Sequence, residues 1–183
     1  MPASSGQLAP PALQDLLTDG TLAGSWALDP RASSVRLKAK VMGLITVNGG
    51  FSEVAGAGTV QPDGTVRGQL TVGTASIDTR NTRRDVHLRS ADFFDSDNSP
   101  DITFATSGVR PQDQGVVVTG ALTIRGQTRP LSVATTVSVR GDGEIVLDAT
   151  VQINRADFGI TWNALGLTSM NATVTIHATF VRG

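Results

Sequence analysis

The sequence predicts an all-β protein in which about eight antiparallel strands form a closed barrel or a sandwich. First, apolar and polar residues alternate with a period of two along most of the chain after residue 26, as in strands with one buried face. Second, turn-forming residues separate these segments at hairpin spacing. Third, the 20 glycines, the low aromatic content of 4% and the many Val and Thr residues fit a sheet better than a helical bundle. We divide the chain into an N-terminal extension, 1–23, and one barrel domain, 24–183.

The clearest strand pattern is VRLKAKV at residues 35–41, whose apolar residues share one face and whose basic residues share the other. Later segments repeat this alternation and predict one apolar, inward-facing set. Its members are Val35, Leu37, Ala39, Val41, Leu70, Val72, Ala75, Ile77, Ile102, Phe104, Val118, Leu122, Ile124, Leu131, Val133, Val137, Val139, Ile145, Leu147, Ala149, Val151, Ile153, Ala172, Val174, Ile176, Ala178 and Phe180. The turn signals between segments include Pro62-Asp63-Gly64, Arg125-Gly126-Gln127 and Gly141-Asp142-Gly143.

A short helix is predicted over residues 11–17, ahead of the first strand. Leu13, Leu16 and Leu17 share one face of it, and Gly20 supplies a stop signal. So short a helix is unstable on its own, and its leucines must therefore dock on another surface. We favour a plug at one end of the domain, with a partner-binding helix as the alternative.

Residues 82–95, TRRDVHLRSADFFD, hold the densest charge cluster of the chain. They predict a second short helix with Thr82 as N-cap and Asp85 as its capping-box partner. The charged groups expected to form an ion-pair network here are Arg83, Arg84, Arg89, Asp85, Asp92, Asp95 and Asp97. An exposed pair contributes less than about 1 kcal/mol, so this network would fasten a lid across the sheet rather than perform chemistry. Residues 163–171 are predicted to form an unusually apolar loop.

The residues give little support to catalysis, metal binding or nucleic-acid binding. Of the two histidines, His177 is predicted to face solvent and His87 to be a hydrogen-bonded structural residue. No serine lies in a nucleophile elbow, no histidine pair has metal-ligand spacing, and DFFDSD lacks the glycine and glutamate of a calcium loop. The absence of cysteine excludes disulfides and thiolate zinc sites. A net charge of −1 without a basic stripe argues against a nucleic-acid surface.

The N-terminal segment does not match a signal peptide, because it lacks a basic start and Pro10, Pro11, Asp15 and Asp19 interrupt its apolar residues. No apolar run in the sequence is long enough to cross a bilayer. We therefore expect a cytoplasmic protein without a membrane span.

The predicted interior is built mainly from Val, Ala, Thr and Leu, with few aromatic residues. In an eight-stranded barrel, the side chains either fill the interior or leave room for one small ligand. Composition leaves both alternatives open. A cavity, if present, would have apolar walls and few polar anchors, which predicts a lipid or another long apolar molecule as its ligand.

Seven short motifs occur in a fixed order along the predicted barrel domain. They are WALDP (26–30), GF (50–51), ASIDT (75–79), RDVHLRSADFFD (84–95), PDITF (100–104), GALTIRG (120–126) and RADFGI (155–160). In this order the chain resembles the YceI-like family, whose members have a lipocalin-like antiparallel β-barrel and bind polyisoprenoids or similar long-chain lipids. The resemblance implies a long apolar channel with a helical segment near its mouth.

The resemblance also implies that Leu88, Phe94 and Phe104 contribute to the channel and that Phe158 and Trp162 lie near its rim. Combined with the strand pattern, it predicts a ligand site of sixteen residues. They are Val35, Leu37, Leu70, Val72, Ile77, Arg84, His87, Leu88, Phe94, Phe104, Leu122, Val133, Leu147, Phe158, Trp162 and Ile176. His87 and Arg84 are the candidates for head-group contacts if they turn inward. We expect no metal and no cofactor other than a bound isoprenoid or other long-chain lipid.

Three functions are compatible with these features. The first is a non-enzymatic carrier or sequestering protein for a polyisoprenoid or similar lipid. The second is an enzyme, an isomerase or cyclase acting on a bulky apolar substrate, in which His87 with Asp85 or Asp92 moves a proton. The third is an interaction module with a filled barrel. The family and the leucine-rich N-terminal helix make a homodimer a reasonable expectation.

Overall fold

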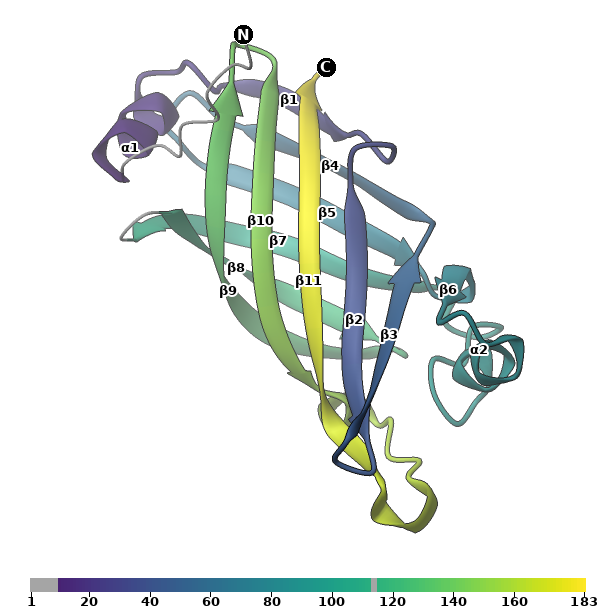
Figure 1. The fold of residues 1–183 in the computed structure, drawn as a ribbon. Coiled ribbons are helices and arrows are strands. Elements are labelled where there is room, and N and C mark those ends of the chain that lie inside the picture. Colours follow the sequence, from purple (N-terminus) through teal and green to yellow (C-terminus); the bar gives the residue numbers. More distant parts are fainter. Residues whose placement is uncertain (1–9, 113–114) are drawn as a thin grey trace, which may run out of the picture.

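The computed structural model describes residues 10–112 and 115–183. Over these residues, eleven strands form one sheet, and eight of them close into an antiparallel ring (Figure 1). The ring strands are β1 (Gly24–Leu28), β4 (Val54–Val60), β5 (Val66–Gly73), β7 (Asp101–Gln112), β8 (Gly115–Ile124), β9 (Gln127–Arg140), β10 (Glu144–Asn154) and β11 (Thr168–Arg182). The ring closes because β1 pairs with β4 and also with β11. The predicted antiparallel barrel of about eight strands is confirmed, and the sandwich alternative is wrong.

Three further strands extend one wall beyond the ring. β2 (Ser34–Val41) and β3 (Ile45–Phe51) form a hairpin, and the two-residue β6 (Ile77–Asp78) pairs with β3. β11 is long enough for β1 to pair with its C-terminal part while β2 pairs with its N-terminal part. The β2–β3 hairpin therefore continues the barrel wall past the end of the ring, as Figure 1 shows.

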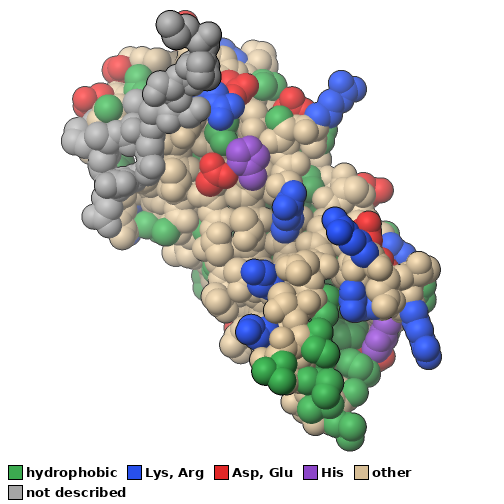
Figure 2. Space-filling model, viewed as in Figure 1, with side chains coloured by type: hydrophobic (Ala, Val, Ile, Leu, Met, Phe, Trp, Pro, Cys, Tyr) green, Lys and Arg blue, Asp and Glu red, His purple; other side chains and the backbone are tan. Residues whose placement is uncertain are grey.

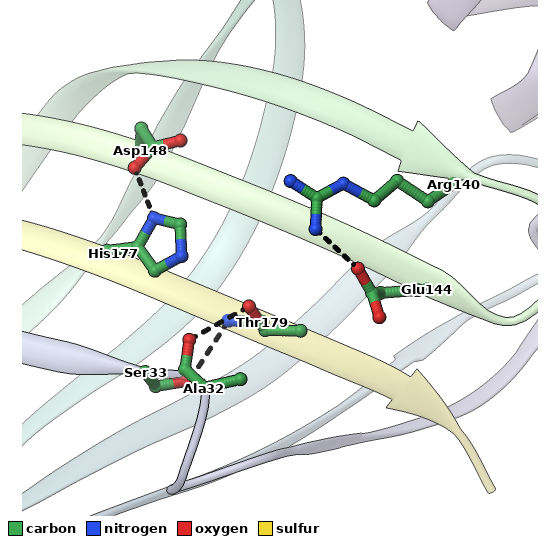
Figure 3. A network of polar contacts seen from close by, with 7 residues as sticks. All are labelled: Ala32, Ser33, Arg140, Glu144, Asp148, His177 and Thr179. Atoms are coloured by element: carbon green, nitrogen blue, oxygen red, sulfur yellow. Dashed lines mark hydrogen bonds and ion pairs between the residues drawn. The ribbon is translucent and has the colours of Figure 1, made fainter. Parts of the chain in front are cut away.

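At Thr179, the partner strand of β11 changes from β1 to β2. The Thr179 carbonyl accepts a hydrogen bond from the Asp29 amide at 2.8 Å, as in an ordinary ladder. The Thr179 amide instead donates to the Ser33 hydroxyl at 3.0 Å, and the Thr179 hydroxyl donates to the Ala32 carbonyl at 3.0 Å (Figure 3). A serine hydroxyl thus replaces a strand carbonyl as the acceptor of the Thr179 amide where the edge changes.

The outer face of β9, β10 and β11 carries exposed polar pairs. His177 and Asp148 lie opposite each other, with Nδ1 and Oδ1 2.6 Å apart, and Arg140 contacts Glu144 at 3.0 Å (Figure 3). The prediction that His177 points away from the apolar face is therefore confirmed. Such exposed pairs contribute little to stability.

Helix α1 (Pro10–Thr18) plugs one end of the barrel. Leu13 and Leu17 are buried in a cluster with Leu22 and Trp26, and the Trp26 indole N–H donates to the Leu22 carbonyl at 3.0 Å. The predicted end plug is confirmed, and these leucines are buried against the helix's own barrel. Within the described parts of the chain, no helix has both the length and the apolar character that a membrane crossing requires.

Helix α2 (Thr82–Arg89) lies at the opposite end, but its predicted capping box is wrong. The N-cap is Asn81, whose side-chain oxygen accepts from the Arg84 amide at 3.0 Å. Asp85 is buried and accepts from the amide of Thr79 at 2.9 Å and from its hydroxyl at 2.5 Å. The carboxylate of Asp85 therefore binds Thr79, in the turn before the helix. It does not cap the first amide of the helix as predicted.

The predicted arginine–aspartate network is also wrong. Among the described residues of this segment, the single close acid–base pair is His87 with Asp92. Arg89 donates instead to the carbonyls of Ala75 and Ile77, at 2.8 and 2.9 Å, and Arg84 donates to Thr79. The short 3₁₀ turn η1 (Thr74–Ser76) and β6 leave carbonyls outside the regular ladder, and a guanidinium has enough donors to satisfy several of them. The lid is fastened by arginine–carbonyl bonds.

We expect Asp85→Ala to lower the free energy of unfolding by about 2–3 kcal/mol, because the buried amide and hydroxyl of Thr79 lose an ionised acceptor. The matched control is Asp92→Ala, which removes an exposed carboxylate from the same segment and should cost less than about 1 kcal/mol. Urea denaturation of both variants measures the difference. Equal losses in the two variants would show that Asp85 does not anchor the lid.

The expected loop at 163–171 is shorter than predicted. It contains the 3₁₀ turn η3 (Ala164–Gly166), and β11 already begins at Thr168. A register irregularity between Thr168 and Ala172 precedes the regular pairing of β11 with β2. The loop therefore projects from the end of β11, beside the β2–β3 turn, to which it is joined by the hydrogen bond from the Met42 amide to the Leu167 carbonyl.

Candidate functional site: an internal apolar cavity

The barrel encloses a cavity of about 960 Å³. This is near the upper end of the range of about 300–1,000 Å³ that is usual for small-molecule sites. Its walls are mainly aliphatic side chains from the inward positions of the ring strands and of β2. Gly58 and Gly68 face each other across β4 and β5 without side chains, which adds room inside. The alternative of a filled barrel is therefore wrong.

The two ends of the cavity differ. At the α1 end, Leu13, Leu17, Leu22 and Trp26 line the cavity, and all four are buried. At the α2 end, the lining includes Trp162, which is 36% exposed. The α1 end is therefore the closed end and the α2 end is the mouth.

Fourteen of the sixteen predicted site residues line this cavity. They are Val35, Leu37, Leu70, Val72, Arg84, His87, Leu88, Phe94, Phe104, Leu122, Val133, Leu147, Trp162 and Ile176. Arg84 and His87 do turn toward the cavity, at its mouth. Contact of each residue with a ligand stays a prediction.

Ile77 and Phe158 lie outside the cavity wall. Ile77 is fully buried where η1 passes into β6, and its side chain packs under Gly49 of β3. Phe158 is buried in a cluster with Leu122 and Ile160 at the end of the 3₁₀ turn η2 (Arg155–Phe158). Ile77 was predicted to face inward from the strand alternation, which does not hold in a strand as short as β6. Phe158 was placed near the rim by the family resemblance, and the structure instead buries it among Leu122 and Ile160.

The mouth contains an aromatic cluster that the sequence did not reveal. The ring of His87 lies edge-on to Trp162, with centroids 4.5 Å apart, and edge-on to Phe93 at 5.1 Å. Phe93 and Trp162 are 5.3 Å apart, and His87 Nε2 lies 2.8 Å from Asp92 Oδ2. The family resemblance implied a channel position for Phe94 but not for Phe93. Because α2 ends at Arg89, the turn that follows brings both Phe93 and Phe94 to the cavity.

Arg155 holds the loop on the other side of the mouth. Its guanidinium donates to the carbonyls of Ile160 at 3.0 Å, Trp162 at 2.7 Å and Ser169 at 3.0 Å, and it lies 5.6 Å from the Phe93 ring centroid. Partial burial lowers the pKa of this guanidinium below its ordinary value. The carbonyls offset the cost of burying the charge. The mouth therefore has two fixed sides, one made by α2 and the other by this loop.

Polar lining groups gather mainly at the mouth, and none of the arrangements there is that of a known catalytic site. Arg84 is committed to Thr79, whereas Arg83 is exposed. The His87–Asp92 pair could move a proton if a substrate atom came within hydrogen-bond distance. Within residues 10–112 and 115–183, no three His, Asp or Glu side chains are grouped so that they could hold a metal ion.

The fold and this cavity define a class: antiparallel β-barrels that enclose an apolar chamber, with one end plugged and the other end under a helical lid. Comparison with known proteins is more specific. The model of the YceI-like domain matches residues 26–181, and the chain belongs to this family. The resemblance inferred from the ordered motifs is confirmed.

Two curated relatives illustrate the range of similarity. A UPF0312 protein of Serratia proteamaculans is 28% identical over 177 residues, which cover 91% of this chain and 92% of that protein. Protein YceI of Escherichia coli is 38% identical over 73 residues, which cover 40% of this chain and 38% of that protein. The stronger identity therefore spans well under half of the Escherichia coli protein's length.

Solved structures share the fold. Burkholderia cenocepacia BcnA superposes with a TM-score of 0.76 at 23% identity, covering 83% of this chain and 98% of that one. A polyisoprenoid-binding domain from Saccharophagus degradans, implicated in plant cell wall breakdown, gives a TM-score of 0.73 at 16% identity, covering 86% and 98%. At these identities the two neighbours establish a shared fold.

Proposed function

We propose that this protein binds a polyisoprenoid or a similar long-chain lipid inside its barrel and acts as a carrier or sequestering protein. The observation that carries the proposal is the apolar cavity of about 960 Å³ with one closed end and one mouth. The polyisoprenoid-binding domain of Saccharophagus degradans, which shares the fold, supports the choice of ligand class. A single chain would enter tail first and end near Leu13 and Leu17.

The affinity would come from removing the chain from water. Each methylene group buried contributes about 0.8 kcal/mol before the cost of ordering the chain is subtracted. The side chains of the walls are held by the closed sheet, so little further ordering of the protein is needed. The walls carry few polar groups along the barrel, so they select length and apolar character rather than a particular functional group.

The head group would remain at the mouth. Arg83 is exposed there and His87 lies on the rim, whereas the guanidinium of Arg84 already binds Thr79. We therefore assign head-group contacts to Arg83 and His87 before Arg84. A phosphate or hydroxyl at the end of the lipid would suit these donors.

The test is native mass spectrometry of protein purified without detergent, followed by organic extraction and by titration with a long-chain isoprenoid alcohol. We expect a co-purified apolar molecule, or saturable uptake at one molecule per chain. Protein that carries no lipid and takes up no isoprenoid alcohol would contradict the proposal. A shorter alcohol, of one isoprene unit, is the matched ligand control and should bind far more weakly because it buries fewer methylene groups.

A second candidate, an isomerase or cyclase, rests on the His87–Asp92 pair at the mouth. It predicts that the bound lipid is recovered chemically altered and that His87→Ala abolishes the alteration. Recovery of unaltered lipid after prolonged incubation supports the carrier proposal instead. Mass spectrometry of the extracted lipid distinguishes the two.

A further inference from the structure

Two chain segments project past the barrel at its mouth and expose large apolar side chains. The β2–β3 turn carries Met42, Leu44 and Ile45, and the η3 loop carries Leu165 and Leu167; we name these five residues the apolar tip. Leu44 is 89% exposed and Leu165 is 91% exposed. Figure 2 shows hydrophobic side chains gathered at this end of the molecule, in the region where Figure 1 places the two segments. The tip is one surface, because the Met42 amide donates to the Leu167 carbonyl at 2.6 Å.

The backbone of the tip makes this exposure more unusual. Met42 has φ of 57° and precedes Gly43, and Leu165 has φ of 57° and precedes Gly166. Asparagine, aspartate or glycine normally occupies such left-handed positions, since a bulky side chain is strained there. Both turns therefore place a large apolar residue where a polar one would fit the backbone better and would also face water more favourably. Stability of the isolated chain does not account for this choice.

Positive charge lies beside the tip. Lys38 and Lys40, the two lysines of the chain, face solvent on β2 immediately before the turn. The residues paired with them across β3 and β11 are uncharged: Asn48, Thr46 and Thr173. Figure 2 shows Lys and Arg side chains next to the hydrophobic end. An apolar surface edged by positive charge is the pattern that binds the interface of an anionic bilayer.

The carboxylates at this end belong to the lid and to η2. Asp92 is paired with His87, and Asp85 is buried against Thr79. Asp157, in η2, is exposed. Arg83, on α2, adds a further exposed positive group at the mouth. Lys38 and Lys40 are the charged side chains next to the tip on β2, whereas the exposed Asp97 and Asp157 lie on the lid and on η2.

The tip is also continuous with the cavity. Ile45 belongs to the tip and also lines the cavity. Trp162, on the neighbouring rim, lines the cavity as well and is 36% exposed. Tryptophan is favoured at the boundary between bilayer and water. A bilayer in contact with the tip would therefore meet the mouth as well.

We propose that the apolar tip inserts shallowly into the surface of an anionic lipid bilayer and presents the cavity mouth to it. Surface binding requires no cargo, and only the consequence, passage of an apolar chain between bilayer and barrel, rests on the proposed function. A second copy of the chain is the competing occupant of the tip. A two-fold contact through the tip would bring Lys38 and Lys40 of both copies close together without an opposing acid, which disfavours it.

The experiment measures sedimentation with vesicles of phosphatidylcholine, with or without phosphatidylglycerol. Wild-type protein should bind the anionic vesicles, bind the neutral ones weakly, and lose most of the difference at high salt. Leu44→Ser combined with Leu165→Ser should weaken binding about tenfold or more, because two buried leucine contacts are lost. The matched control is Val181→Ser, which alters an exposed apolar residue at the other end of the barrel and should leave vesicle binding unchanged.

The contribution of the lysines to vesicle binding is tested with two single substitutions that change the charge by the same amount. Lys40→Glu should weaken binding to anionic vesicles about tenfold, whereas Arg110→Glu, on β7 near the closed end, should not. The fluorescence of Trp162, obtained as the difference between the wild type and Trp162→Phe, should shift to shorter wavelength when anionic vesicles are added. Circular dichroism checks that each variant retains the fold.

The outcomes separate this proposal from the carrier function. Leu44 and Leu165 do not line the cavity, so their double variant should still take up an isoprenoid alcohol delivered from ethanol, but should take it up more slowly from anionic vesicles. The docking proposal is overturned if wild-type protein ignores anionic vesicles, or if the tip variants bind them as the wild type does. A third result would also overturn it: the wild type is a dimer by chromatography, the tip variant is a monomer, and neither binds vesicles. The tip would then be a contact between copies of the chain.

Discussion

Ala149→Trp should abolish tight binding of a long-chain lipid while leaving the barrel folded. Ala149 is the central residue of β10 and lines the cavity, so an indole at this position would lie across the chamber about midway between plug and mouth. If the indole excludes about four methylene groups from the cavity, at about 0.8 kcal/mol each, affinity falls about 200-fold. Stability should change little, because the new side chain occupies empty space.

The matched control for Ala149→Trp is Thr150→Trp. Thr150 is the next residue of the same strand, its side chain faces solvent, and its replacement introduces the same indole outside the barrel. Fluorescence titration with a long-chain isoprenoid alcohol should give wild-type affinity for this control, with a free energy of unfolding within about 0.5 kcal/mol of the wild type. Undiminished binding in Ala149→Trp would mean that the lipid does not occupy the middle of the barrel.

Trp26→Ala should be among the most destabilising single substitutions, with a loss of about 3–5 kcal/mol in the free energy of unfolding. Trp26 is buried, contacts the leucines of the plug and donates to the Leu22 carbonyl. The guanidinium of Arg182 lies over its ring, 4.6 Å from the centroid, and donates to the carbonyls of Thr21 and Ala23. The indole thus joins α1, β1 and the end of β11.

The other tryptophan provides the comparison. Trp162 is partly exposed at the mouth, and Trp162→Ala should cost about 1 kcal/mol because little packed volume is lost. Thermal and urea denaturation of both variants measures the difference. Similar losses at the two ends would show that the α1 plug is not packed as the structure has it.

The strands and their inner faces were predictable because long strands of an antiparallel sheet obey a period of two. The alternation in β2, β10 and β11 placed Leu37, Leu147 and Ile176 on the cavity wall, and the structure agrees. The plug was predictable for a similar reason, since three leucines on so short a helix require a partner surface. Where the element is short, as at β6, the same rule misplaced Ile77, whereas Phe158 was misplaced by the family resemblance.

The fastening of the lid could not be read from the sequence. Arginines and aspartates lie close together in residues 82–95, and proximity suggested ion pairs. The choice of partner depends on which backbone carbonyls the fold leaves without a donor, and these are created by η1 and β6, about ten residues earlier in the chain. The volume of the chamber was likewise unreadable, because small side chains fit both a filled and an open barrel until the positions of the strands are known.

The most direct test of the central claim is a crystal structure of the protein with a heavy-atom-labelled isoprenoid alcohol. We predict continuous density that enters at the mouth beside the cluster of Phe93 and Trp162, passes Ala149 and ends near Leu13, with the label on the tail found at the plug. Density for the chain only on the outer surface, or side chains closed together across the barrel, would contradict the account.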